Sequence, residues 1–258
     1  MGQILKYTLF DLLRNRWTLL YAAFYLVLTT GLFWLSGDTS QVLISLMNIV
    51  LLLAPLVATM FSITYYYHAR DFVELLLAQP LRRTQIFMGQ YLGIASSLAL
   101  GLLVGLGLPL LLFGVGAVAA DFATLLLSGM LLSFVFAGVA FFIALHHDNR
   151  IKGFGLALLV WLFFAVIYDG VVLLIMATLG DYPLDRFAVG ASVLNPIDLS
   201  RLLVLLKLDI SALMGYAGAI FRQFVGSGPG MVLAAACLLA WAVLPLWGIR
   251  HRALRRDF

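Results

Sequence analysis

Long apolar runs separated by short polar breaks dominate this chain. Each run has at least the roughly 20 residues that a helix needs to cross a bilayer core of about 30 Å. The breaks between them collect Gly, Asp and Arg. Lipid offers the backbone no hydrogen-bond partners, so such runs are expected to be helices, and the alternating polarity of barrel strands is not found in the sequence. The six runs cover residues 17–36, 41–67, 86–113, 122–146, 153–179 and 230–249.

The composition agrees with this pattern. The 258 residues are 64% hydrophobic and 11% charged, with a mean hydropathy of +1.07, whereas soluble domains are about half apolar. We therefore predict an all-α polytopic membrane protein with a single transmembrane domain over residues 1–258. The first run is too long for a secretory leader, so no cleavage is expected. The single cysteine, Cys237, lies inside an apolar run, which excludes a disulfide framework or a paired-cysteine metal site.

The basic residues predict the orientation. If the N-terminus is cytoplasmic, twelve Lys and Arg residues fall in inner segments and four in outer segments, all four of them between residues 180 and 229. The positive-inside rule then places both termini in the cytoplasm of a bacterial cell, with the chain in the inner membrane. The same segregation explains the basic pI of about 9.3. Its positive charge faces anionic lipid, and no nucleic acid partner is expected.

The segment before the first run predicts a helix that lies along the inner membrane surface. Residues 1–16 place apolar side chains on one helical stripe and Lys6, Arg14 and Arg16 elsewhere, as an interfacial helix requires. The stripe consists of Ile4, Leu5, Leu9, Leu12 and Leu13. The alternative is a ragged start of the first spanning helix, which fits the charges less well.

The longest inner loop runs from His68 to Gln85 and reads HARDFVELLLAQPLRRTQ. It predicts a short amphipathic helix that is stopped by Pro80 and followed by Arg82 and Arg83. A helix parallel to the membrane would present a rigid surface to a soluble partner. The alternative is a solvated charged loop that serves the topology alone.

The outer segment at about 180–229 is long and rich in leucine, with Arg201 and Lys207 among the leucines. It is too short and too charged for a comfortable span, so one or two outer helices at or dipping into the interface are expected. A seventh span is the rival interpretation. It would turn the basic C-terminus outward, against the charge rule.

Asp169 is the only acidic residue well inside a predicted span. A carboxylate in lipid needs a partner or a proton, so Asp169 is a candidate functional residue, or a structural group that bonds a neighbouring helix or the outer loop. The methionines, and the pair His146 and His147, have no metal-ligand spacing, so no metal site is expected. Gly101 and Gly105 form a GxxxG pattern that indicates close helix packing. Walker, GxSxG and HExxH motifs are absent from the sequence.

Three segments together resemble the ABC-2 permease superfamily over essentially the whole chain. They are LRNRW (Leu13 to Trp17), ELLLAQPLRRTQIFMGQYLG (Glu74 to Gly93) and LNPIDLSRL (Leu194 to Leu202). The first and third, with Asp169, are similar to a subgroup that serves the maturation of nitrous-oxide reductase. Two departures stand in the middle segment: HARDFV lacks the glycine usual in relatives, and Gly89-Gln90 replaces the usual Gly-Lys.

The resemblance implies a type V exporter-like fold and a permease half of an ATP-driven transporter. Two copies would pair above two copies of a separate ATPase, which would hold ATP and Mg²⁺ and hydrolyse the ATP, so no cofactor and no catalytic residue are expected in this chain. The outer surface would meet a periplasmic solenoid protein and a copper chaperone, in export or mechanical coupling for copper-site maturation. The ATPase contact would comprise Arg70, Asp71, Glu74, Leu75, Leu76, Leu77, Pro80, Arg82 and Arg83, and the outer motif Asn195, Pro196, Asp198 and Arg201.

Other classes of function remain open on the residues alone. A secondary transporter or channel should show repeated halves with broken helices or several polar groups inside the membrane, and Asp169 stands nearly alone. A membrane enzyme needs a cluster of catalytic groups at one depth, and none is found in the sequence. A membrane anchor or scaffold without an ATPase fits the same residues.

Overall fold

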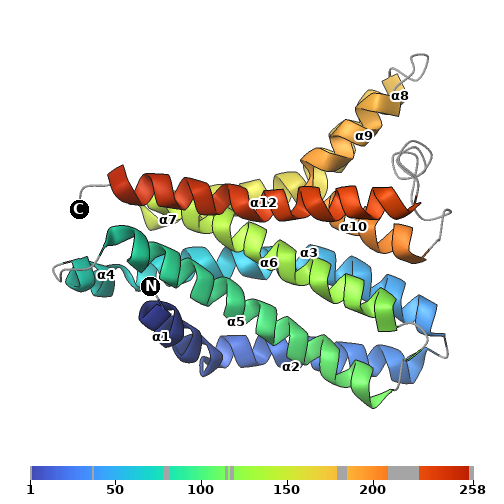
Figure 1. Ribbon diagram of the computed structural model, residues 1–258, viewed down its shortest axis with the longest axis horizontal. Coiled ribbons are helices and arrows are strands. Elements are labelled where there is room, and N and C mark those ends of the chain that lie inside the picture. The colour runs from blue at the N-terminus through green and yellow to red at the C-terminus, as the bar shows by residue number, and fades with distance from the viewer. Residues whose placement is uncertain are drawn as a thin grey trace.

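The computed structural model describes residues 2–36, 38–77, 82–113, 116, 119–178, 185–208 and 227–255, and the elements in these ranges are helices (Figure 1). The predicted all-α fold is therefore confirmed. Its helices are α1 Gly2–Leu13, α2 Arg16–Leu35, α3 Thr39–His68, α4 Arg70–Leu77, α5 Arg83–Leu112, α6 Ala119–His146, α7 Arg150–Leu162, the π-helix η2 Phe163–Ile167, α8 Tyr168–Thr178, α9 Asp185–Leu194, α10 Pro196–Leu208 and α12 Ser227–Arg255.

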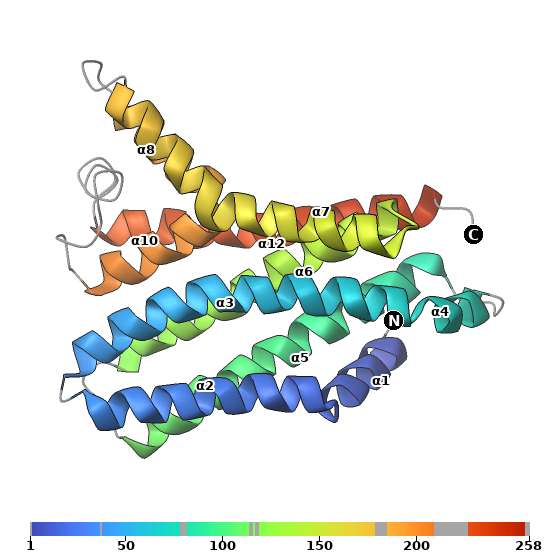
Figure 2. The same cartoon turned by 180° about the vertical axis from the view of Figure 1, so that it is seen from behind.

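Six helical stretches are long and apolar enough to cross a membrane. They are α2, α3, α5, α6, the joined stretch Arg150–Thr178, and Gly228–Arg252 within α12. These stretches contain the six apolar runs of the sequence to within one residue, and α3, α5 and α6 begin two or three residues before the predicted starts. In Figures 1 and 2 the helices lie roughly along one axis, with α1, α4 and the C-terminus at one end of the bundle. We call this the inner end, after the orientation that the basic residues predict.

Helix α1 is a separate element rather than a ragged start of α2. The helical conformation is interrupted at Arg14 and Asn15. The Asn15 side chain accepts a hydrogen bond of 3.2 Å from the main-chain N–H of Trp17 and so caps α2. Leu12 is buried, while Lys6 and Arg14 are exposed, as the amphipathic pattern predicts. Helix α1 packs against α5 and also contacts α2.

Close approaches between helices occur at glycines of α5. A Cβ atom added to Gly105 would lie 2.7 Å from the carbonyl oxygen of Ala22, and one added to Gly101 would lie 3.1 Å from the ring of Tyr21. The predicted role of the GxxxG pattern in helix packing is therefore confirmed, with α2 as the partner helix. The core of the bundle lies among α3, α5 and α6, where buried aromatic rings meet. Tyr66 and Phe141 form an edge-to-face pair with ring centroids 5.3 Å apart.

The fifth long stretch differs from a simple packed span. Helix α7 packs against α3 and α6, and α8 then turns away from the bundle (Figure 2). Helix α9 returns to the bundle and meets α10 at an angle of 109°. Helix α10 packs against α3, α6 and α12, so α7 and α10 share two neighbours. The rival seventh span is therefore not a straight helix in these residues: α9 projects with α8, and α10 lies along the bundle.

Candidate functional site

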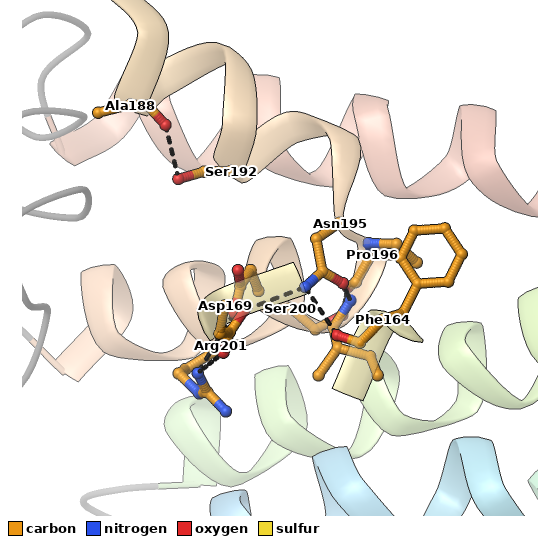
Figure 3. Close-up of polar contacts among 10 residues, drawn as sticks. Phe164, Asp169, Ala188, Ser192, Asn195, Pro196, Ser200 and Arg201 are labelled. Carbon is orange, nitrogen blue, oxygen red and sulfur yellow. Dashed lines mark hydrogen bonds and ion pairs between the residues drawn. The ribbon is translucent and has the colours of Figure 1, made fainter. Parts of the chain in front are cut away.

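The break between α9 and α10 is held by a cluster of polar residues that we call the outer joint: Phe164, Asp169, Asn195, Asp198 and Arg201. Asn195 is fully buried at its centre (Figure 3). Its side-chain oxygen accepts a bond of 3.0 Å from the N–H of Ile197 and caps α10. Pro196 follows as the first helical residue, a position where its missing N–H costs nothing.

The amide nitrogen of Asn195 ties this cap to the fifth stretch. It donates 2.9 Å to the main-chain carbonyl of Phe164 and 3.3 Å to a carboxylate oxygen of Asp169. Phe164 lies in η2, where the N–H of Tyr168 bonds to the carbonyl of Phe163, five residues back. A π-helical turn shifts the hydrogen-bond register and makes carbonyls available to outside donors. The bend in the fifth stretch and the start of α10 are therefore bonded to each other.

Arg201 joins two carboxylates across the same joint. Its guanidinium lies 3.3 Å from Asp169 and 3.2 Å from Asp198. The three side chains are 39%, 30% and 23% exposed in that order, so solvent screening weakens each pair. Helix α10 lies outside the six long stretches, and there burial raises the pKa of Asp198 to about 7, with the Asp169 carboxyl adding to the rise and Arg201 opposing it. One arginine thus forms ion pairs with two acids, one on each side of the joint.

Two aromatic side chains extend the joint to other helices. The hydroxyl of Tyr168 donates 2.7 Å to the carbonyl of Ala191, and the indole N–H of Trp241 on α12 donates 3.1 Å to the carbonyl of Val193. Both acceptors belong to the last turn of α9. The structure thus brings the outer motif and Asp169 together. Sequence reasoning missed Tyr168 and Trp241, because an aromatic residue in an apolar run gives no sign that its polar end has a partner.

Helix α4 carries the described part of the predicted ATPase contact. Val73 is buried against the bundle, whereas Phe72 and Leu75, one turn apart, are 59% and 69% exposed. Leu76 is half-buried against the core. Arg82 and Arg83 are exposed at the start of α5. Arg70 begins the helix; the side chains of Asp71, Glu74 and Leu77, and the whole of Pro80, lie outside the described residues.

The inner end also bonds α3 and α4 to the turn before α7. Arg70 forms an ion pair of 3.8 Å with Asp148 in that turn. The hydroxyl of Tyr67, at the end of α3, donates 2.7 Å to the carbonyl of His147. Gly153 in α7 lies directly against this hydroxyl, where a Cβ atom would not fit. In the described part of the chain, no three His, Cys, Asp or Glu side chains gather as metal ligands would.

Among the described residues, six long apolar helices define a polytopic α-helical membrane protein. Shorter helices lie at both ends of its bundle, α1 and α4 at the inner end and α9 and α10 at the outer joint. Two relatives match nearly its whole length. The chain is 31% identical over 260 residues to the probable ABC transporter permease protein NosY of Stutzerimonas stutzeri, covering 92% of each chain. It is 29% identical over 276 residues to the protein of the same name from Pseudomonas aeruginosa, covering 98% of this chain and 97% of the other. No protein-family model matches the chain.

This chain therefore belongs to the NosY-like family of ABC transporter permeases. The resemblance stated from the sequence is confirmed. As a permease, the chain is a membrane subunit of an ABC transporter, and an ATPase is its partner in that transporter.

Proposed function

We propose that this chain forms a homodimer above two copies of a separate ATPase and transmits the ATPase cycle across the membrane for the maturation of the copper site of nitrous-oxide reductase. ATP and Mg²⁺ would be held by the ATPase, and the chain itself would bind no cofactor. The transmission would take the form of export or of mechanical coupling. The observation that carries the proposal is Leu75, a large apolar side chain that is 69% exposed on a short helix anchored to the bundle by Val73.

The environment of α4 supports an ATPase contact. The helix follows the long α3 and lies at the inner end, so it is placed where a soluble subunit would reach it (Figure 2). Two large apolar side chains exposed one turn apart suit an interface, and burying one leucine there contributes about 1.5–3 kcal/mol. Arg82 and Arg83 are exposed nearby along the chain and would form a charged rim.

A chain of hydrogen bonds and an ion pair supports mechanical coupling from the inner end to the outer joint. Arg70 and Tyr67 connect α4 and α3 to the turn before α7. Helix α7 leads directly into η2, whose Phe164 carbonyl is bonded to Asn195. A displacement of α4 by the ATPase would therefore be transmitted to α7 and would change the bend at η2. The changed bend would then move α9 and α10.

The orientation supports the same assignment of partners. The excess of Lys and Arg on the inner segments favours cytoplasmic termini in the bacterial inner membrane. The α8 and α9 pair and the outer joint would then face the periplasm, where a solenoid protein and a copper chaperone would dock. The segments Leu194 to Leu202 and Leu13 to Trp17, which resemble the subgroup that serves nitrous-oxide reductase, support these two partners.

The test replaces Leu75 by Asp in the full chain co-expressed with its ATPase. The variant should lose the ATPase on purification but stay a folded dimer by gel filtration, because a carboxylate would be buried without a partner at the contact. Ile151→Asp is the matched control: Ile151 is 82% exposed in the first turn of α7 at the same inner end, where an acidic residue suits the helix dipole. Retention of the ATPase by Leu75→Asp, or equal loss from both variants, would contradict the assignment of α4 and favour the scaffold interpretation.

A further inference from the structure

A groove with a volume of about 930 Å³ runs between α1 and the inner end of α3. Helix α1 packs on α5 and touches α2, and this groove opens between it, the last turns of α3 and α4. The volume lies within the range of small-molecule sites, about 300–1,000 Å³. Its lining includes Tyr7, Asp11, Trp17, Met60, Tyr65 and Phe72.

The groove is mainly apolar, with the polar side chains of Thr8, Asn15, Thr64 and His68 and one acidic residue in its lining. Leu12, Met60 and Phe61 supply apolar surface, and the rings of Tyr7, Trp17 and Tyr65 add aromatic faces. Among the lining residues Asp11 is the only acidic side chain, and there is no Lys or Arg. A carboxylate bordered by aromatic rings suits an ammonium group, which gains both an ion pair and cation–π contacts.

A positive charge lies one helical turn away. Arg14 follows Asp11 by three residues, so the two lie on the same side of the helix, about 5–6 Å apart at Cβ if the helix continued. Both side chains are exposed, and within the described residues neither has an ion-pair partner. A carboxylate followed by an arginine matches a headgroup that carries an ammonium and then a phosphate.

The groove is also continuous with the surface that meets lipid tails. Met60 on α3 and Trp17 on α2 line it and are 40% and 66% exposed on two long apolar helices. A ligand there would have its apolar part among these side chains and its charged part at the α1–α2 break. A phospholipid has this division, whereas a small water-soluble ammonium compound has nothing to place along Leu12 and Met60.

We propose that this groove binds a phospholipid of the phosphatidylethanolamine type. Its ammonium lies at Asp11, its phosphate at Arg14, and one acyl chain runs along Leu12, Met60 and Phe61. The lipid fills the space between α1 and α3 and so connects the N-terminal helix to the helix that leads into α4. The site stands apart from the copper and ATPase proposals, because it requires only the membrane-embedded chain.

The headgroup is tested by native mass spectrometry of the detergent-purified full chain, incubated with an equimolar mixture of phosphatidylethanolamine and phosphatidylglycerol. The wild-type chain should retain phosphatidylethanolamine about tenfold over phosphatidylglycerol, as one charge-assisted contact provides. Asp11→Asn should bring this ratio close to one. Asp38→Asn is the matched control: Asp38 caps α3 at the opposite end, Asn caps equally well, and the ratio should stay at the wild-type value.

The apolar part is tested by filling the groove. Met60→Trp should lower retention of both lipids, and Leu52→Trp should not, because Leu52 is equally exposed at 41% on the same helix but lies outside the groove. Equal retention of the two lipids by wild type, or an unchanged ratio in Asp11→Asn, would overturn the proposal. A third result would also overturn it: a dimer in wild type and in Leu52→Trp but a monomer in Met60→Trp. In that case a second copy of the chain, and not a lipid, would occupy the groove.

Discussion

The side-chain amide of Asn195 donates a 2.9 Å hydrogen bond to the main-chain carbonyl of Phe164, 31 residues earlier in the chain. The same side chain caps α10 through its oxygen. One buried residue therefore joins the irregular turn of the fifth stretch to the first turn of the helix that packs along the bundle. A movement of either element has to move the other or break this bond.

Replacing Asn195 by Ala should destabilise the outer joint by about 1–3 kcal/mol, because it removes a helix cap and leaves the Phe164 carbonyl without its donor. The loss should appear as a lower thermal midpoint of the purified chain. Asn48→Ala is the control, since Asn48 is exposed and bonds only to the carbonyl of Ile44 in its own helix. An equal shift in both variants would mean that the bond to Phe164 adds nothing.

The two acids of the joint should differ in their tolerance of substitution. Asp198→Asn should leave assembly and ATPase-driven function close to wild type at neutral pH, because a carboxyl with a pKa of about 7 is already half-protonated there. Asp169→Asn keeps the hydrogen bond to Asn195 but loses its ion pair with Arg201, a partly exposed pair that contributes about 1 kcal/mol or less. Both variants should therefore assemble, with Asp169→Asn slightly less stable.

Stimulated ATP hydrolysis and thermal midpoints of the two complexes measure this difference. A loss of function in Asp169→Asn with normal expression and assembly would instead identify Asp169 as a proton or cation site.

The spanning helices follow from the sequence because apolar length alone determines them in a bilayer. The outer joint does not. Its centre, Asn195, is a single amide whose partners lie on elements 26 and 31 residues away, and the π-helix at Phe163–Ile167 reads as an uninterrupted apolar run. The sequence identified Asp169 and the motif from Asn195 to Arg201 separately. Only the folded chain brings them within hydrogen-bond distance.

The topology predicted from the basic residues is tested by cysteine labelling in a Cys237→Ala background. Ile151→Cys, at a position that is 82% exposed in the first turn of the fifth stretch, should react only with reagents that cross the membrane. Lys207→Cys, exposed in the last turn of α10, should react with impermeant reagents added from outside. The reasoning is the excess of Lys and Arg on the inner segments. The reverse pattern of labelling would show that the chain has the opposite orientation in the membrane.

The contact between α1 and α5 provides the last prediction. A Cβ atom added to Gly93 would lie 2.7 Å from Cβ of Thr8, closer than packed side chains allow, and the neighbour is the stem of a side chain rather than its flexible end. Gly93→Ala should therefore push α1 off α5 and cost about 1–3 kcal/mol. Gly107→Ala in the same helix is the control, because no atom lies within 4 Å of its added Cβ.

The displaced α1 should become sensitive to trypsin at Lys6, which is exposed but held in a packed helix in the native chain. Thr8→Gly in the Gly93→Ala background removes the clashing atoms and should restore protection from trypsin. The double variant should remain less stable than wild type by about 1 kcal/mol, the cost of a glycine within a helix. The two substitutions are then coupled, with the double variant more stable than their separate effects add up to. Additive effects, or protection in Gly93→Ala equal to that in Gly107→Ala, would show that α1 does not depend on this contact.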